Sequence, residues 1–555
     1  MNKVIIYQVF TRLFGNRNQN RKENGTIEEN GSGKMSSFDT ATLQRIKSLG
    51  ATHVWYTGVI RHATATDYSA YGIPRQHPAI VKGRAGSPYA ITDYYDIDPD
   101  IADNVENRMA EFEALIERTH EAGLKIVMDF VPNHVARQYK SIAKPCGVKD
   151  LGETDDTGMH FSANNNFYYC WGMPFAPGID LKGDADTPYT ETPAKATGND
   201  NFGNAPGRND WYETVKLNYG IDYCDAGGRS EHFSPIPDTW DKMTDILLFW
   251  ASKGIDAFRC DMAEMVPAAF WAWATDKVKY RHPEIKFIGE VYNPNEYRNY
   301  ISSGFDYLYD KVGMYDCVRD VICGQRPAAD ITRQWQATDD ISGHMLYFLE
   351  NHDEQRIASD FFAGSGVKGI PGLIVSALMN KNPFMLYAGQ EFGEPGMDKE
   401  GFSGVDGRTT IFDYWTVPTL YRGYCDRRKQ TADEKHLAKL YATVLNVAKK
   451  EKAVSEGEFY DLMYVNHDIS NSVYAFLRKW KNEVLLVAAN FSDASTECEI
   501  NIPGHAFDFL GIAEGVYEAT DLLNKEKAVL LLNGDKTVKI NLGAYSGCIW
   551  KFKCK

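Results

Sequence analysis

The chain has 555 residues, of which 43% are hydrophobic and 24% are charged, and its formal net charge is −15. This length exceeds what a single hydrophobic core usually serves, so we expect one large domain with one or two smaller ones. The negative charge opposes binding to polyanions, and we therefore expect no nucleic-acid partner and no membrane partner. No apolar run is long enough to cross a bilayer or to act as a signal peptide.

The ten cysteines are scattered singly, without the paired spacing of a structural zinc site. A chain of this size needs no disulfide bonds for its stability. Both observations favour a reducing compartment, and we predict a cytoplasmic location. The sequence gives no indication of the oligomeric state.

An amphipathic helix, a glycine and an apolar strand follow one another three times along the chain. The three copies cover residues 43–57, 108–130 and 238–261. This order is typical of βα units, in which successive strands are parallel. With the other apolar segments it gives eight predicted strands, at residues 4–10, 53–57, 125–130, 255–261, 286–289, 305–309, 345–349 and 383–387. Eight parallel strands alternating with helices predict an α/β fold, a (β/α)8 TIM barrel.

Two regions break this pattern and indicate further domains. Residues 135–235 are rich in Gly, Asn, Asp, Pro and aromatic residues without helical spacing, which predicts an inserted domain after the third strand. Residues 456–555 contain β-rich runs separated by turn residues, which predicts a C-terminal antiparallel β-sandwich. The barrel itself is then formed by residues 1–134 and 236–455.

Polar clusters follow four of the predicted strands, where each strand ends. They are DFVPNH at 129–134, FRCD at 258–261, GE at 289–290 and ENHD at 350–353. Because all strands of such a barrel end at the same rim, we expect these side chains to meet in one pocket. Carboxylates gathered in a pocket repel one another and lose hydration, which separates their pKa values into an ionised and a protonated member. Cleavage of a glycosidic bond needs such a pair.

A structural interpretation competes with the functional one at each of these positions. A single aspartate at a strand end, such as Asp261, is more often a helix cap or a turn residue than a catalyst. Glu290 taken alone favours neither interpretation. Four polar strand ends in the order of one rim are hard to obtain by chance, so the joint pattern favours a functional site.

At these residues the sequence resembles the α-amylase family of glycoside hydrolases. DFVPNH, GIDAFRCD, FIGEVY and FLENHDEQ resemble the four conserved regions of that family in their order and approximate spacing, and YAGQEFGE resembles the segment after its last barrel strand. The resemblance covers the whole barrel. It implies a retaining enzyme that cleaves α-1,4-glucosidic bonds in starch, glycogen or maltooligosaccharides through a covalent glycosyl-enzyme intermediate.

The resemblance also assigns roles to individual residues. It implies that Asp261 is the nucleophile, Glu290 the general acid and base, and Asp353 a third carboxylate that binds sugar hydroxyls. Arg259 lies two positions before Asp261 on the same face of its strand, where it would keep that carboxylate ionised through a charge-assisted hydrogen bond. A purely structural salt bridge is the alternative for Arg259.

Further residues are implied to bind the substrate. They are His134, His352, Tyr89 and Asp129, of which the two histidines would hydrogen-bond the sugar and Tyr89 would stack on its face. Packing in the core is the alternative for Tyr89. The aromatic residues of YYCW at 168–171 have the faces that stack on sugar rings, although such residues often fill a domain core.

The resemblance implies a structural Ca²⁺ between the barrel and the inserted domain. Asn133 and Asn218 fall at the family's ligand positions, and oxygen ligands suit this hard cation. In the alternative interpretation the two amides satisfy backbone groups. The loop at residues 14–34 is also rich in Asn, Glu and Gly, and we interpret it as a solvated loop.

The sequence departs from the family directly after Asp261. Met262, Glu264 and Met265 stand where many α-amylases have residues that contact the sugar on the leaving-group side. A preference for α-1,6 bonds, exo action or glucan transglycosylation therefore stays open beside α-1,4 hydrolysis. A non-catalytic interaction barrel is a more distant alternative, because such relatives lose the catalytic carboxylates and carry a transmembrane helix.

Overall fold

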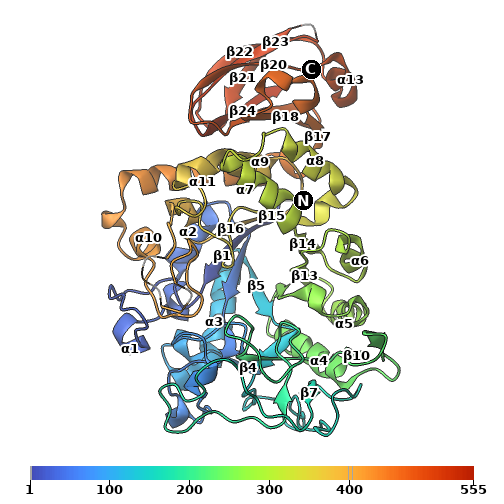
Figure 1. Ribbon diagram of the computed structural model, residues 1–555. Helices are drawn as coiled ribbons and strands as arrows, with labels where there is room; N and C mark the ends of the chain where they lie inside the picture. Colours follow the sequence, from blue (N-terminus) through green and yellow to red (C-terminus); the bar gives the residue numbers. More distant parts are fainter. Residues whose placement is uncertain (1–2, 398, 400, 403, 535, 555) are drawn as a thin grey trace.

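Eight parallel strands form a closed barrel in the computed structural model, which describes residues 3–397, 399, 401–402, 404–534 and 536–554 (Figure 1). In barrel order the strands are β1 (Ile5–Phe10), β2 (His53–Thr57), β5 (Lys125–Phe130), β12 (Ala257–Cys260), β13 (Lys286–Gly289), β14 (Tyr307–Tyr309), β15 (Met345–Phe348) and β16 (Phe384–Tyr387). All eight predicted strands are present, and the predicted TIM barrel is confirmed.

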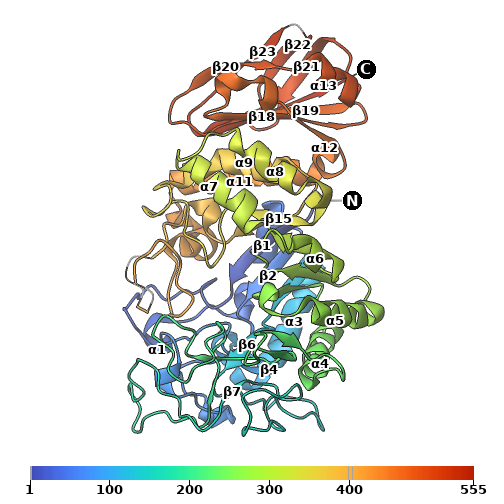
Figure 2. The ribbon, with the colours of Figure 1, turned by 45° about the vertical axis from the view of Figure 1, so that its right-hand side comes forward.

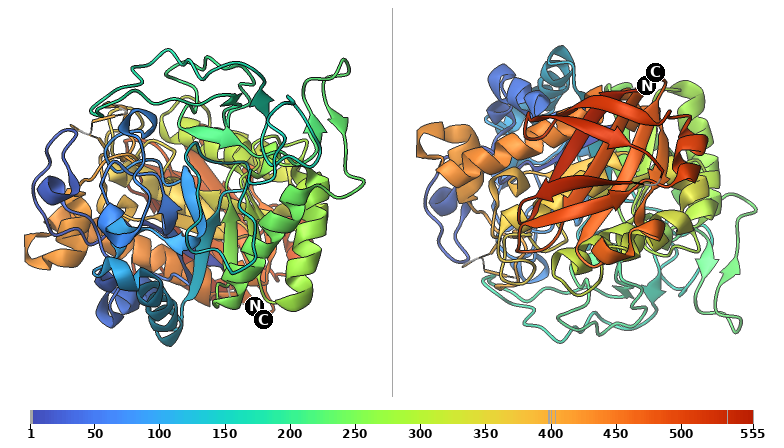
Figure 3. Two further views of the ribbon diagram at one scale, coloured as in Figure 1. Left: turned by 90° about the horizontal axis from the view of Figure 1, so that it is seen from below. Right: turned by 90° about the horizontal axis from the view of Figure 1, so that it is seen from above.

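Helices cover the outside of the barrel (Figure 3). The helices of at least six residues in this region are α2 (Thr40–Ser48), α3 (Arg108–Glu121), α4 (Asp238–Ser252), α5 (Ala268–Arg281), α6 (Tyr297–Ser302), α7 (Asp316–Ile322), α8 (Asp330–Ala337), α9 (Ile370–Leu378) and α11 (Ala432–Lys450). In α4 the side chains of Trp240, Met243, Leu247 and Trp250 are buried, as their spacing of three and four predicts. Within the described residues, none of the helices has the length and apolar character needed to span a membrane.

The inside of the barrel is filled by apolar side chains from its strands. Ile6, Trp55, Val127, Ile288 and Leu346 belong to one buried cluster there. Because side chains alternate between the two faces of a strand, the neighbouring positions point outward toward the helices. Because side chains fill the interior of the barrel, we expect a pocket at its rim.

The segment between β5 and α4 forms an irregular region beyond the C-terminal ends of the strands. Within it, β6 (His134–Ala136) pairs with β9 (Thr214–Lys216) in antiparallel register, so that His134 lies opposite Lys216. A second small pair joins β7 (Tyr169–Cys170) and β8 (Ala194–Lys195). The insertion after the third barrel strand is therefore confirmed, while its limits at residues 135 and 235 stay a prediction.

The C-terminal region forms antiparallel sheets at the end of the molecule opposite the inserted segment (Figure 2). Its strands are β17 (Glu458–Asp461), β18 (Val473–Trp480), β19 (Glu483–Asn490), β20 (Thr496–Asn501), β21 (Gly515–Asp521), β22 (Lys527–Leu532), β23 (Thr537–Leu542) and β24 (Ser546–Lys553). Strands β20 and β23 form a separate pair, and the other six form one sheet. The predicted C-terminal β domain is confirmed, and its start at residue 456 stays a prediction.

Candidate active site

Two of the three predicted catalytic carboxylates, Asp261 and Glu290, lie one residue beyond the ends of adjacent barrel strands, whereas Asp353 follows the end of β15 by five residues. The backbone N–H of Asp261 donates to Phe130 O at 2.9 Å, and that of Glu290 donates to Cys260 O at 3.1 Å. These bonds continue the parallel ladders past the last strand residues. Both carboxylates are thereby fixed at the rim, and their residues are only 5% and 3% exposed.

The buried guanidinium of Arg259 joins three carboxylates from three strands. Its Nη1 lies 2.8 Å from Asp261 Oδ1 and 3.2 Å from Asp129 Oδ1, and its Nη2 lies 2.7 Å from Glu290 Oε2. The planar fork of an arginine holds its partners in a fixed relative orientation. The predicted contact between Arg259 and Asp261 is therefore present, and Arg259 also forms an ion pair with Glu290.

The carboxyl groups of this cluster compete for protons. Burial raises the pKa of Asp261 well above its usual value, Arg259 opposes this rise, and the charges of Glu290 and Asp129 add to it. Burial likewise raises the pKa of Asp129 to about 6, against the effect of Arg259. One arginine does not neutralise three carboxylates, so the site binds a proton more readily than solvated carboxylates do.

Glu290 has two further partners that the sequence analysis missed. Its Oε2 accepts from the backbone N–H of Met262 at 2.8 Å, and its Oε1 accepts from the hydroxyl of Tyr292 at 2.5 Å. Met262 also has a φ of 43°, an unfavourable left-handed conformation for a non-glycine residue. Tyr292 stands two positions after Glu290 in FIGEVY, so this same-face spacing was a signal available in the sequence.

His352 connects the fourth polar cluster to the pocket. Its Nδ1 lies 2.8 Å from the amide Nε2 of Gln8, which can only donate, so Nε2 of His352 carries the proton. That Nε2 lies 3.1 Å from Asp353 Oδ2 and within hydrogen-bond distance of the Tyr89 hydroxyl. Burial lowers the pKa of His352 well below its usual value. The neutral ring therefore bridges two groups that face the substrate space.

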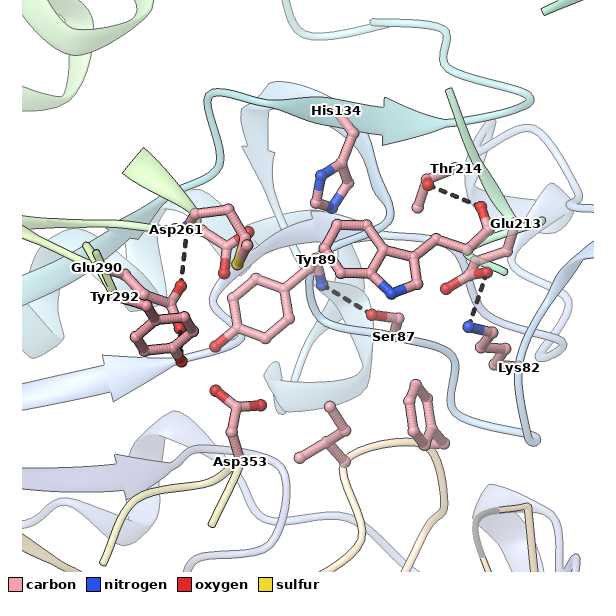
Figure 4. Close-up of a pocket in the computed structure, with 14 residues that line it drawn as sticks. Lys82, Ser87, Tyr89, His134, Glu213, Thr214, Asp261, Glu290, Tyr292 and Asp353 are labelled. Carbon is pink, nitrogen blue, oxygen red and sulfur yellow. Dashed lines mark hydrogen bonds and ion pairs between the residues drawn. The ribbon is translucent and has the colours of Figure 1, made fainter. Parts of the chain in front are cut away.

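The candidate residues line one pocket of about 290 Å³ (Figure 4). Asp261, Glu290, Tyr292 and Asp353 lie at one end of this pocket, and the Lys82–Glu213 ion pair, at 3.1 Å, lies at the other. The pocket is further lined by Ser87, Tyr89, His134, Trp211, Thr214, Met262, Ile411 and Phe412. Of the predicted substrate-binding residues, Tyr89 and His134 line the pocket directly, and Arg259 and His352 contact residues that line it. Asp129 lies behind them and is connected to the pocket through Arg259. The sequence analysis missed Lys82, Trp211 and Glu213.

Other residues singled out from the sequence have different surroundings. The carboxylate of Glu264 accepts from the backbone N–H groups of Tyr292 and Asn293 at 2.9 and 3.0 Å, so it stabilises a loop. Tyr168 and Tyr169 are buried, as core residues are, whereas Trp171 is 62% exposed. Neither Tyr168 nor Trp171 lines the pocket.

The two predicted calcium ligands are engaged by protein groups. Asn133 Oδ1 accepts from the Lys216 ammonium at 2.8 Å. Asn218 Oδ1 accepts from the backbone N–H of Gly220, and its Nδ2 donates to Ser162 O, both at 2.8 Å. A cation would have to displace a lysine and a backbone donor from these oxygens. The residues present thus do not form a free set of calcium ligands, and a bound calcium ion itself stays untested.

Carboxylates gathered beside a pocket at the rim of a (β/α)8 barrel fit the class of glycoside hydrolases. The family model for the alpha amylase catalytic domain matches residues 8–443, and that for the alpha amylase C-terminal all-beta domain matches residues 464–553. The chain therefore belongs to the alpha-amylase family.

Similar proteins agree with this assignment. Alpha-amylase 3 of Dictyoglomus thermophilum is 24% identical, with 99% of this chain and 93% of the relative covered. The crystal structure of a noncanonic maltogenic alpha-amylase, AmyB from Thermotoga neapolitana, covers 100% of this chain and 99% of its own, with 20% identity and a TM-score of 0.63. The crystal structure of an alpha-amylase from Geobacillus thermoleovorans complexed with acarbose covers 100% of this chain and 98% of its own, with 16% identity and a TM-score of 0.65. These structural likenesses show the shared fold.

Proposed function

We propose that this enzyme hydrolyses α-1,4-glucosidic bonds in starch, glycogen or maltooligosaccharides with retention of configuration. The observation that carries the proposal is the Arg259 guanidinium, which holds the carboxylates of Asp261 and Glu290 together at one end of the pocket. Retention needs the two carboxyl groups about 5 to 5.5 Å apart, with no room for water between the carboxylate and the ring. A shared guanidinium favours such a short separation.

In the proposed first step, the Glu290 carboxylic acid gives its proton to the glycosidic oxygen while an oxygen of Asp261 attacks the anomeric carbon. The bond to the leaving sugar breaks, and a covalent glycosyl ester forms on Asp261. In the second step, Glu290 takes a proton from water, the water oxygen attacks the anomeric carbon, and the ester bond breaks. Atoms and charges balance, and Glu290 regains its proton.

Two groups support the roles assigned to the carboxylates. The Arg259 guanidinium opposes the rise that burial causes in the pKa of Asp261, and in this way it favours the ionised form that a nucleophile requires. The side chain of Asp353 is 37% exposed and faces the pocket, so its oxygens can accept from sugar hydroxyls. The hydroxyls gain a charge-assisted hydrogen bond, which strengthens as the ring distorts toward the transition state.

A second candidate is an exo-acting or maltooligosaccharide-trimming enzyme of the same family. The Lys82–Glu213 ion pair bounds the pocket end opposite the carboxylates, which favours a short stretch of glucan there. An α-1,6 preference and glucan transglycosylation remain further alternatives, since the position after the nucleophile is Met262. A cytoplasmic location is also part of the proposal, because all ten cysteines are free thiols.

The test is hydrolysis of soluble starch, pullulan, isomaltose and maltoheptaose side by side, with the anomeric configuration of fresh products read by NMR. We expect α-anomers from starch and maltoheptaose, and no cleavage of isomaltose. Initial β-anomers would overturn retention. Cleavage of isomaltose alone would overturn the linkage, products longer than the substrate would indicate transfer, and release of a single short sugar would favour exo action.

A further inference from the structure

A buried lysine lies where the inserted segment joins the barrel. The Nζ of Lys216 lies 2.8 Å from Asn133 Oδ1 and 2.5 Å from Asp200 Oδ1. The lysine side chain is 2% exposed, and its ammonium also faces the ring of Tyr223, at 5.8 Å from the centroid. Removing an ammonium from water is costly, so a lysine in this position needs partners of this quality.

The ammonium and its two oxygen partners come from three different parts of the chain. Asn133 follows barrel strand β5, Lys216 ends strand β9, and Asp200 lies in the loop between β8 and β9. Backbone bonds at the same place pair β6 with β9 and join Leu217 N to Asn133 O at 2.9 Å. The charge therefore ties the exit of the third barrel strand to both sides of the inserted segment.

We propose that the Lys216 ammonium is a built-in cation that takes the place of the calcium ion expected at Asn133, so that the inserted segment is held to the barrel without a metal. Carboxylate and amide oxygens are the ligands that a hard cation uses, and here they face a cationic side chain. A calcium ion at Asn133 Oδ1 would also lie beside a positive charge, which repels it. Within the described residues, no group of three or more His, Cys, Asp or Glu side chains could hold a metal ion.

The built-in cation also orients a pocket residue. Because an ammonium only donates, the Asn133 atom that faces Lys216 is its oxygen, and Nδ2 is directed to the other side. There Nδ2 donates to Gly198 O at 2.7 Å and to His134 Nδ1 at 3.1 Å. His134 consequently carries its proton on Nε2. Burial lowers the pKa of His134 to about 3, and the charge of Lys216 adds to this effect.

Lys216 is thus a positioning residue that acts on His134 through Asn133. In the neutral ring with a protonated Nε2, His134 offers one hydrogen-bond donor to a ligand in the pocket. A loose Asn133 amide would leave both the tautomer and the ring orientation undefined. Loss of Lys216 should therefore affect ligand binding as well as the attachment of the inserted segment.

The first experiment uses the full wild-type chain and calcium itself as the probe. We expect the same Tm, within about 1 °C, after dialysis against EDTA and after addition of millimolar CaCl₂, because a ligand that binds the folded state would raise Tm. We also expect far less than one calcium per chain by mass spectrometry of the metal content. A Tm that rises with calcium, or a stoichiometric calcium content, would overturn the proposal whether or not the chain hydrolyses starch.

The second experiment compares Lys216→Met with Lys182→Met, a matched change of an exposed lysine in the same segment. We expect Lys216→Met to lower Tm by roughly 5 °C or more in EDTA, since Asn133 and Asp200 lose their partner. We also expect it to raise the KM for maltoheptaose several-fold through His134. Lys182→Met should change neither value.

An unchanged Tm for Lys216→Met would exclude the structural role. A lower Tm with an unchanged KM would exclude the link to His134. If Lys216→Met does not fold, Asp200→Asn provides the milder variant, because it removes one partner of the ammonium from a side chain that is 30% exposed. It should lower Tm by a smaller amount, and it too should give a Tm insensitive to EDTA.

Discussion

Arg259 at the barrel rim and Arg478 in strand β18 both bury a guanidinium, but their surroundings differ. Arg259 faces the carboxylates of Asp129, Asp261 and Glu290. Burial lowers the pKa of Arg259, but the effects of Glu290, Tyr309, Tyr89 and Asp261 outweigh burial and raise this pKa well above its usual value. At the rim, each charge therefore has charged partners, and the cluster opens onto a pocket.

Arg478 contacts backbone carbonyls instead. Its three nitrogens donate to the oxygens of Met379, Ala453, Val454 and Gly457 at 2.7 to 2.9 Å. Burial lowers the pKa of Arg478 to about 9, against the opposing effect of Glu458. This guanidinium connects the chain after α9, the short helix α12 (Lys452–Ser455) and the C-terminal sheet. A buried charge alone therefore does not indicate a catalytic site, whereas competing carboxylates that face a pocket do.

Of the substitutions that compare the two regions, Asp261→Asn should have the largest effect, and this effect should be on turnover and not on stability. We expect turnover of maltoheptaose to fall by a factor on the order of 10⁴ or more, because an amide cannot form the glycosyl ester. The Tm should change little, since the side chain keeps its shape and Arg259 retains two other carboxylates. Steady-state kinetics and calorimetry measure the two values. Turnover above one hundredth of wild type would contradict the nucleophile assignment.

Arg478→Met should lower the stability of the protein and leave turnover nearly unchanged, the opposite of what we expect for Asp261→Asn. Four buried carbonyl oxygens lose their donors, which we expect to destabilise the protein by about 3 to 5 kcal/mol. Turnover per folded molecule should stay within a factor of about two, because the residue is remote from the pocket. Tm and active-site-titrated kcat check this expectation. A fall in kcat of the fully folded Arg478→Met variant would contradict the distinction that we draw between Arg259 and Arg478.

Asp129→Asn tests the charge competition at the rim through pH. Burial raises the pKa of Asp129 from 3.8 to about 6 in the folded protein, so the folded state binds this proton more tightly than the unfolded state. Ionisation of Asp129 therefore destabilises the protein as pH rises from about 4 to about 6, by about 3 kcal/mol in total. Asp129→Asn has no carboxyl group to ionise at this position, so the variant does not lose stability in this way as pH rises.

The Tm of the Asp129→Asn variant, relative to wild type, should accordingly increase between pH 4 and pH 6 and then level off. Thermal unfolding of both proteins across this range is the measurement. Asp238→Asn serves as the control, because that carboxylate is 41% exposed and lies outside the pocket. A Tm difference that does not vary with pH, or that decreases, would contradict the raised pKa.

The smallest effect should come from Tyr292→Phe, which removes one hydrogen bond to Glu290. A hydrogen bond to a charged group contributes about 1.5 to 3 kcal/mol, so we expect kcat to fall by about one to two orders of magnitude. The KM should change less than kcat, because the hydroxyl contacts Glu290, the proposed catalytic acid. Tyr280→Phe is the matched control, since Tyr280 is 87% exposed. Equal kcat values for the two variants would exclude the role of Tyr292.

The parts of the site that the sequence predicted are local in the chain. Asp261 and Glu290 were found because each directly follows an apolar strand, and parallel strands must end at one rim. Arg259 and Asp261 could be placed on one face because side chains alternate along a strand. The roles of these residues stay predictions, but their convergence in one pocket follows from the topology.

The parts that the sequence missed depend on contacts between distant segments. Gln8 fixes the tautomer of His352, Trp55 donates to Asp129 at 2.9 Å, and Lys82 pairs with Glu213. None of these pairs follows from spacing, because the loops that bring them together have no regular period. The predicted calcium ligand Asn133 illustrates the same limit, since its partner Lys216 comes from the far side of the insertion.

The sequence by itself determined the barrel, the order of the added domains and the carboxylates at the rim, because hydrophobic periodicity and strand ends are properties of neighbouring residues. The tertiary structure decided which charges share a partner: Arg259 with Asp261 and Glu290, and Lys216 with Asn133. Such pairings arise only when loops of unpredictable path exclude water around the charges. Because these charges are buried, the loss of one partner changes the free energy of unfolding by several kcal/mol.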